Sequence, residues 1–175
     1  MIDWEFNYAH FFTLEKILDV EDLSDFREKS RSKKIVFTNG FFDLLHPGHV
    51  FLLYEARLLG DILVVGVNSD ISIQKEDIFA ISKNKVSRVI NDIEHRVIML
   101  STMFFVDFIT VFDEANPEEV IRELMPDVLV KGLDWEGKDI AGAEFVRSRG
   151  GEVKFVDSHY ATTTTKMIEK IKSTL

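Results

Sequence analysis

IVFTNGFFDLLHPGHVFLLYEARLLGD occupies residues 35–61 and holds the most informative pattern of the chain. Its apolar start, rich in Val, Ile and Phe, predicts a buried strand. Its second half predicts an amphipathic helix that begins near Pro47, because proline is tolerated in the first helical turn. This helix would place Val50, Leu53 and Tyr54 on one face. His46 and His49 flank Pro47 and Gly48 at this strand-to-helix junction. Three residues apart, the two imidazoles face the same way at the start of the helix.

The same alternation of apolar and amphipathic runs continues along the chain. Five apolar runs predict buried strands: 33–38, 62–68, 106–112, 127–132 and 152–157. Amphipathic stretches that predict helices lie between them. A strand–helix rhythm of this kind is typical of a single α/β domain with a Rossmann-like, doubly wound parallel sheet, here of five strands. Such sheets bind ligands at the carboxyl ends of their strands, which is where the two histidines fall.

Composition and charge narrow the classes of function. The chain has 175 residues, 46% of them hydrophobic, which is enough for one compact domain. It has no cysteine, so disulfides, thiolate metal sites and cysteine nucleophiles are excluded, and a cytoplasmic location is expected. The first residues are acidic and do not resemble a signal peptide, and no apolar run reaches the ~18 residues that span a bilayer. With a net charge of −9, we expect neither a nucleic acid nor a membrane partner.

The histidine pair suggests a site for phosphate. A helix N-terminus offers unpaired N–H groups and the positive end of the helix dipole, and two imidazoles add hydrogen-bond donors to it. Zinc is an alternative, but a zinc site needs a third ligand, and His10, His95 and His159 have no metal-type spacing. A helix cap beside an unrelated surface histidine is a third interpretation. No resident metal site is predicted.

The sequence also supports predictions for two further segments, residues 1–32 and 74–92. Residues 1–32 precede the strand–helix rhythm, and Val20, Leu23 and Phe26 at helical spacing predict a helix packed on the sheet edge. Residues 74–92 lack clear periodicity, and a long loop in a compact domain is often functional. This segment is interpreted either as a lid over the ligand or as a surface excursion.

Three stretches resemble a known family. They are IVFTNGFFDLLHPGHVFLLYEARLLGDILVVGVNSD (35–70), DVLVKGLDWEGKDIAGAEFVRSRGGEVKFV (127–156) and TTTTKMIEKIK (162–172). The His-x-Gly-His motif after Phe-Asp is a hallmark of the cytidylyltransferase-like nucleotidyltransferase superfamily, and the three stretches together resemble its D-glycero-β-D-manno-heptose 1-phosphate adenylyltransferase family. The resemblance implies a helical extension over 1–32, an HxGH-type nucleotidyltransferase domain over 33–175, and a homodimer.

The resemblance also implies an activity and its residues. AMP would pass from ATP to a sugar phosphate such as D-glycero-β-D-manno-heptose 1-phosphate, with pyrophosphate leaving and Mg²⁺ bound to the triphosphate. The catalytic residues would be His46, His49 and Lys75, and the substrate-binding residues Asn68, Asp70, Lys75 and Arg88. The nucleotide-binding residues would be Thr38, Asn39, Gly40, Phe41, Phe42, His46, His49, Arg88, Lys131, Gly132, Asp134, Thr163, Thr164 and Thr165. The threonines have an alternative role as a helix cap, and Asp134 as a turn residue.

Some features favour other members of the superfamily, or another class. DWEGK and EHR also resemble glycerol-3-phosphate cytidylyltransferase, so CTP and a polyol phosphate are the alternative substrates. That family has an arginine where this chain has Phe104, and another that is missing from DSHYATTTT, and both departures disfavour it. From the heptose family the chain departs in its longer segment 74–92 and in Thr163, where that family has serine. A non-catalytic nucleotide sensor on the same fold is the alternative outside the enzymes.

Overall fold

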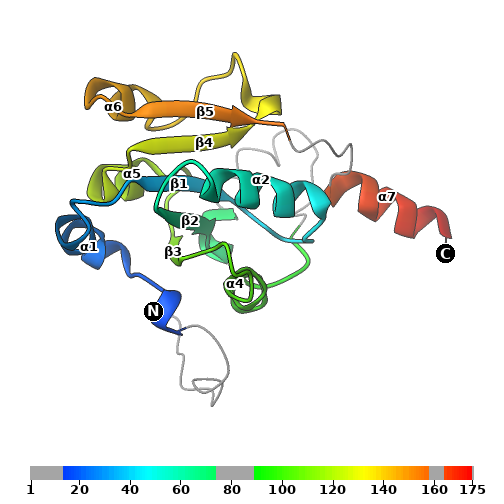
Figure 1. The fold of residues 1–175 in the computed structure, drawn as a ribbon. Coiled ribbons are helices and arrows are strands. Elements are labelled where there is room, and N and C mark those ends of the chain that lie inside the picture. Colours follow the sequence, from blue (N-terminus) through cyan, green and yellow to red (C-terminus); the bar gives the residue numbers. More distant parts are fainter. Residues whose placement is uncertain (1–13, 74–88, 158–163, 175) are drawn as a thin grey trace.

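The computed structural model describes residues 14–73, 89–157 and 164–174, and its centre is a single sheet (Figure 1). The strands are β1 Ile35–Gly40, β2 Ile62–Asn68, β3 Phe108–Phe112, β4 Val128–Gly132 and β5 Glu152–Val156. All neighbouring strands are parallel, in the order β3-β2-β1-β4-β5. The predicted five-stranded, doubly wound parallel sheet is therefore confirmed.

Both faces of the sheet are buried, as the central strand shows. Val36 of β1 belongs to one hydrophobic cluster, whereas its neighbours Ile35 and Phe37 belong to the other. All three side chains are fully buried. Because helices cover both faces, the strands are continuous apolar runs instead of alternating apolar and polar residues.

The helices form a layer on each side of the sheet (Figure 1). One face is covered by α2 Pro47–Arg57 and α4 Ile93–Ser101, and the other by α1 Leu23–Lys29, α5 Glu118–Leu124 and α6 Ala143–Ser148. In the described part of the chain, three short 3-10 helices span Leu14–Lys16, Val20–Asp22 and Leu133–Trp135. A last helix, α7 Thr164–Thr174, projects from the body of the domain. Among the described helices, none is long and apolar enough to cross a membrane.

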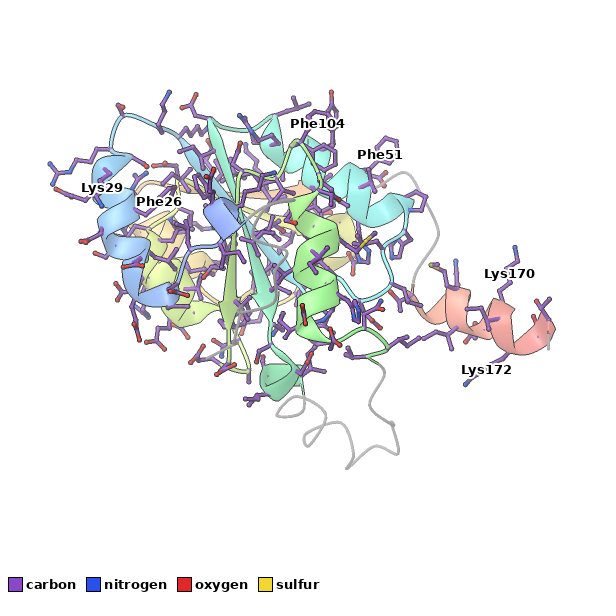
Figure 2. The ribbon with its side chains drawn as sticks, turned by 90° about the horizontal axis from the view of Figure 1, so that it is seen from below. Phe26, Lys29, Phe51, Phe104, Lys170 and Lys172 are labelled. Atoms are coloured by element: carbon purple, nitrogen blue, oxygen red, sulfur yellow. The ribbon has the colours of Figure 1, made fainter. Side chains whose placement is uncertain are left out.

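The helix expected before the first strand is present, but it covers a face of the sheet as well as touching its edge. Leu23 of α1 is fully buried in the cluster that includes α5, and Val20 and Phe26 pack against that cluster. The Phe26 ring also meets the ring of Phe108 on the edge strand β3, with centroids 4.8 Å apart (Figure 2 labels Phe26). The division of the chain at residue 32 stays a prediction.

The buried face of α2 differs from the expected one. Leu53 and Ala56 are fully buried, whereas Val50 and Tyr54, which were expected on the same face as Leu53, are 38% and 41% exposed. The orientation of α2 about its own axis places these two side chains on the outer surface. They leave an apolar stripe on the outside of α2, and the Tyr54 ring reaches Phe105 beyond α4, at 5.8 Å between centroids.

Candidate active site

A cavity of about 460 Å³ lies at the carboxyl ends of β1 and β4, where the start of α2 approaches the sheet. This is the edge at which parallel sheets of this kind bind ligands. Ten of the residues predicted from the sequence line the cavity: Thr38, Asn39, Gly40, Phe41, Phe42, His46, His49, Lys131, Gly132 and Asp134. The cavity therefore brings together two regions that lie some 90 positions apart in the sequence, because β4 pairs with β1.

His46 and His49 form a stacked pair at the start of α2. Their ring centroids are 3.8 Å apart and their planes differ by 24°. His46 has an extended backbone and stands directly before Pro47, so the chain enters the helix between the two imidazoles. The Nδ1 atom of each ring is enclosed and has no hydrogen-bond partner among the described residues. Nε2 is then the nitrogen of each ring that can donate to a ligand.

The electrostatics of the pair keep both imidazoles neutral near pH 7. Burial lowers the pKa of His46 below its usual value of 6.5. Burial, and to a smaller extent the adjacent His46, lower the pKa of His49 to about 4. Both rings therefore offer neutral N–H donors at the N-terminus of α2, whose dipole adds the positive end of a helix. An anion bound here would favour protonation and raise both pKa values.

The loop between β1 and α2 packs against the histidine pair. Phe42 adopts a left-handed backbone with φ 50°, which is uncommon for a residue other than glycine. Its ring meets the His49 ring edge-on, with centroids 5.4 Å apart. Gly40 makes room for this arrangement, because a Cβ on Gly40 would lie 3.3 Å from the Phe42 ring. The position of His49 thus depends on the conformation of this loop.

Lys131 supplies a positive charge to the cavity wall. Its Nζ donates a 2.6 Å hydrogen bond to Oδ1 of Asn39 and lies 5.1 Å from the ring centroid of Trp135. Lys138 approaches the same indole from the exterior of the cavity, at 5.4 Å. Trp135 itself lines the cavity and is half-exposed. It was not predicted as a site residue, although its place just after a strand end is a signal that could have found it.

Not all predicted residues reach the cavity. Asn68 and Asp70 are absent from its lining: the Asn68 amide donates to Ser72, and the Asp70 carboxylate accepts from Ile93 and Arg96. Lys75, Arg88 and Thr163 lie outside the described residues. Thr164 and Thr165 are the first residues of α7.

The donor set fits a metal ion that arrives with the ligand. Among the described residues, no three His, Asp or Glu side chains gather into a metal-binding group. Asp134 nevertheless places a carboxylate at the cavity wall. This carboxylate lies close to the backbone of Gly132, because a Cβ added to Gly132 would be 2.5 Å from Oδ1 of Asp134. Mg²⁺ commonly binds one or two carboxylates together with substrate phosphates, so Asp134 suits a metal carried by a triphosphate.

Sheet order, helical layers and a cavity at the carboxyl edge define a Rossmann-type α/β domain with its candidate ligand site at the first strand-to-helix junction. The chain belongs to the cytidylyltransferase-like family, whose model matches residues 37–175. The superfamily resemblance seen in the sequence is confirmed.

Curated relatives support the same placement. The chain is 41% identical to bifunctional protein HldE of Campylobacter concisus over 166 residues, which cover 95% of this chain and 32% of that protein. It is 44% identical to bifunctional protein HldE of Haemophilus influenzae (strain PittEE) over 144 residues, covering 82% of this chain and 29% of that protein. The chain thus spans about a third of the length of these relatives.

Two solved structures share the fold. The lipopolysaccharide core biosynthesis protein from Thermoplasma volcanium has a TM-score of 0.55 and 26% identity, over 71% of this chain and 98% of that chain. The pantoate-beta-alanine ligase of Francisella tularensis has a TM-score of 0.50 over 81% of this chain and 66% of that chain. At 12% identity, this second likeness is one of fold alone.

Proposed function

We propose that the protein is a nucleotidyltransferase that transfers AMP from ATP to a sugar phosphate such as D-glycero-β-D-manno-heptose 1-phosphate, forming ADP-heptose and pyrophosphate. The observation that carries the proposal is the stacked His46–His49 pair at the N-terminus of α2, inside a cavity at the carboxyl edge of the sheet. The relatives named HldE and the neighbour named for lipopolysaccharide core biosynthesis support the choice of a heptose phosphate.

The reaction needs positioning and charge stabilisation more than covalent chemistry. An oxygen of the sugar phosphate attacks the α-phosphorus of ATP, and the bond from that phosphorus to the oxygen bridging to the β-phosphate breaks. The bridging oxygen keeps the electron pair and leaves with pyrophosphate. No bond to the enzyme forms, so catalysis rests on holding the phosphates in line and stabilising the charge on them.

The described residues have roles that follow from their places. His46 and His49 would donate from Nε2 to the α-phosphate oxygens as charge builds there. Lys131 would neutralise part of the polyphosphate charge, and the Trp135 indole offers an apolar face on which the base or ribose could stack. The backbone of Gly40 to Phe42 would line the nucleotide. Mg²⁺, held by Asp134 and the triphosphate, would supply further charge neutralisation.

The roles proposed for the remaining residues rest on the sequence resemblance. Lys75 and Arg88 would hold the acceptor phosphate, and the threonines 163–165 the outer phosphates of ATP. The enzyme would work in the cytoplasm, where ATP is available. Asn68 and Asp70 stay predicted substrate residues, and their internal hydrogen bonds suggest the indirect role that is argued below.

We also propose a homodimer, supported by an exposed apolar patch. We define this patch as Val50 and Tyr54 of α2, Leu58 directly after α2, and Phe104 and Phe105 after α4. Phe104 is 84% exposed, and its ring meets that of Phe105 at 5.0 Å between centroids. Figure 2 shows Phe104 beside the helix that carries Phe51. Large exposed apolar patches commonly mark protein–protein contacts, and a second copy of the chain is the proposed partner.

A substrate matrix tests the proposed function. ATP and CTP are each offered with D-glycero-β-D-manno-heptose 1-phosphate and with glycerol 3-phosphate, and pyrophosphate release is recorded. The proposal expects the fastest release from ATP with the heptose phosphate. Fastest release from CTP with glycerol 3-phosphate would favour the cytidylyltransferase alternative, which the DWEGK stretch supports. Nucleotide binding without release from any pair would favour a sensor.

A further inference from the structure

Arg96 places a charge inside the domain. It is 1% exposed and is the largest fully buried side chain among the described residues. Its Nη1 donates to the carbonyl oxygens of Phe41 and Asn68 at 2.8 and 2.7 Å. Its Nη2 donates to Oδ1 of Asp70 at 2.7 Å, and its Nε to the carbonyl oxygen of Asn91 at 3.1 Å. A buried guanidinium is costly unless its donors are satisfied, and here three of its nitrogens are engaged.

These acceptors belong to three separate elements at the edge of the candidate site. Phe41 follows β1 directly and lines the cavity, Asn68 is the last residue of β2, and Asn91 precedes α4. One planar side chain therefore joins the ends of two parallel strands to the segment that enters α4. Only a guanidinium presents donors in a fixed fork that reaches acceptors in several directions.

A second set of hydrogen bonds holds the loop after β1 at Asp43, the residue that follows Phe42. The half-exposed segment before α4 donates its Ile90 and Asn91 backbone N–H groups to the Asp43 carboxylate, at 3.0 and 2.8 Å. The Asn91 amide donates to the Asp43 carbonyl oxygen at 3.0 Å. Phe42, with its left-handed backbone, lies between the two fastened residues Phe41 and Asp43.

We propose that Arg96 is a positioning residue for the transfer reaction: with Asn91 it fixes the loop from Phe41 to Asp43 and so holds the Phe42 ring against His49. The proposal rests on the proposed function for its kinetic consequences, but the geometry does not depend on the substrate. Arg96 would touch no substrate, since it is absent from the cavity lining. In this proposal Asn68 and Asp70 act indirectly, as hydrogen-bond acceptors for Arg96.

Arg96→Lys and Arg96→Met are compared with Arg27→Met in kinetics, in thermal unfolding and in the NMR signals of the imidazoles. Lysine keeps the charge but loses the fork, and methionine loses both. Arg27 is the matched control, because it donates two 3.0 Å hydrogen bonds to Asp127 at the other end of the sheet. Because a 1 Å misplacement can cost about 10²-fold in rate, kcat should fall about 10- to 100-fold in both Arg96 variants, with KM for ATP changed less than about threefold.

The imidazole signals separate this proposal from a general loss of stability. They should shift for His46 and His49 in both Arg96 variants and stay in place in Arg27→Met, even when the melting temperatures fall equally. Wild-type kcat in Arg96→Lys, or unshifted imidazole signals in either folded variant, would overturn the proposal. If Arg96→Met does not fold, Arg96→Lys and Asn91→Ala decide, with Asn91→Ala expected to shift the His49 signal and lower kcat to a smaller extent. If the wild type releases no pyrophosphate at all, the proposed function fails, and the imidazole signals still test the positioning.

Discussion

The imidazole rings of His46 and His49 stack with their centroids 3.8 Å apart and their planes 24° from parallel. Such contact between two cations would be repulsive, and burial lowers the pKa of both rings, so the pair is neutral near pH 7. Two neutral N–H donors at a helix N-terminus suit an oxyanion whose charge increases during the reaction. The pair is consequently the most informative place for substitution.

Replacing either histidine by alanine should lower kcat about 10²- to 10³-fold, because each removes a preorganised donor to the transition state. The affinity for ATP should fall much less. Steady-state kinetics of His46→Ala and His49→Ala give the result. His95→Ala is the control, since His95 is exposed and pairs with Asp92 at the start of α4. Wild-type turnover in both cavity variants would remove the pair from the mechanism.

His49 should make the stability of the protein depend on pH. Its pKa is about 4 in the folded protein, whereas an unfolded histidine titrates near 6.5, so the unfolded state binds more protons between these values. The free energy of unfolding should therefore fall as the pH is lowered from 6.5 to 4, by an amount on the order of 1–3 kcal/mol from this residue. Denaturant unfolding of the wild type and of His49→Gln measures it. The dependence should shrink in His49→Gln and persist in His95→Gln, and equal slopes in all three proteins would refute this assignment.

Lys131 should contribute to nucleotide affinity. Lys131→Met removes a charged donor from the cavity wall and should raise KM for ATP about tenfold, the usual effect of losing one charge-assisted hydrogen bond. Lys138→Met is a close control, because both ammonium groups approach the Trp135 indole but Lys138 lies outside the cavity lining. KM should stay within about twofold in the control. Equal effects of the two substitutions would show that only general charge matters.

Lys75 and Arg88 should hold the acceptor phosphate. The chain carries a net charge of −9, so two phosphorylated substrates need positive groups near the site. A Lys75→Ala/Arg88→Ala double variant should raise KM for both substrates and weaken the protection of segment 74–92 against protease when substrates bind. An Arg31→Ala/Lys33→Ala double variant, at the amino end of the sheet, provides the comparison. Unchanged kinetics together with unchanged proteolysis would mean that the segment is a surface excursion.

The apolar patch should mediate dimerisation. Phe104→Glu places a charge at a position that is 84% exposed, so it should not disturb the core but should weaken an apolar contact between two copies. Light scattering after size-exclusion chromatography should give the mass of a dimer for the wild type and that of a monomer for Phe104→Glu. A monomeric wild type at micromolar concentration would refute the homodimer.

The strands and the histidine pair could be predicted because their signals are local. Continuous apolar runs mark strands that are buried on both faces, and Pro47 after a turn marks the start of a helix. The order of the strands in the sheet decides which strand ends lie side by side, and a local pattern does not contain that order. The contacts of Lys131 with both Asn39 and Trp135 could therefore be seen only in the structure.

Burial of individual side chains was harder to predict. Arg96 lies within a helix, where arginine is normally exposed, and it is buried because backbone carbonyls from two strand ends converge on it. Val50 and Tyr54 were expected on the same face of the helix as Leu53, but only Leu53 is buried and the other two lie on the outer surface. Both outcomes follow from tertiary packing that a one-dimensional pattern does not contain.

Phosphorus NMR of one reaction tests the central claim most directly. The protein is mixed with ATP, Mg²⁺ and D-glycero-β-D-manno-heptose 1-phosphate, and the phosphorus signals are followed with time. Direct transfer predicts that the signals of ATP and the heptose phosphate decline together while those of a sugar nucleotide diphosphate and pyrophosphate rise in equal amounts, and that His49→Ala suppresses all four changes. Unchanged ATP, or conversion of ATP to AMP and pyrophosphate with the heptose phosphate left intact, would contradict it.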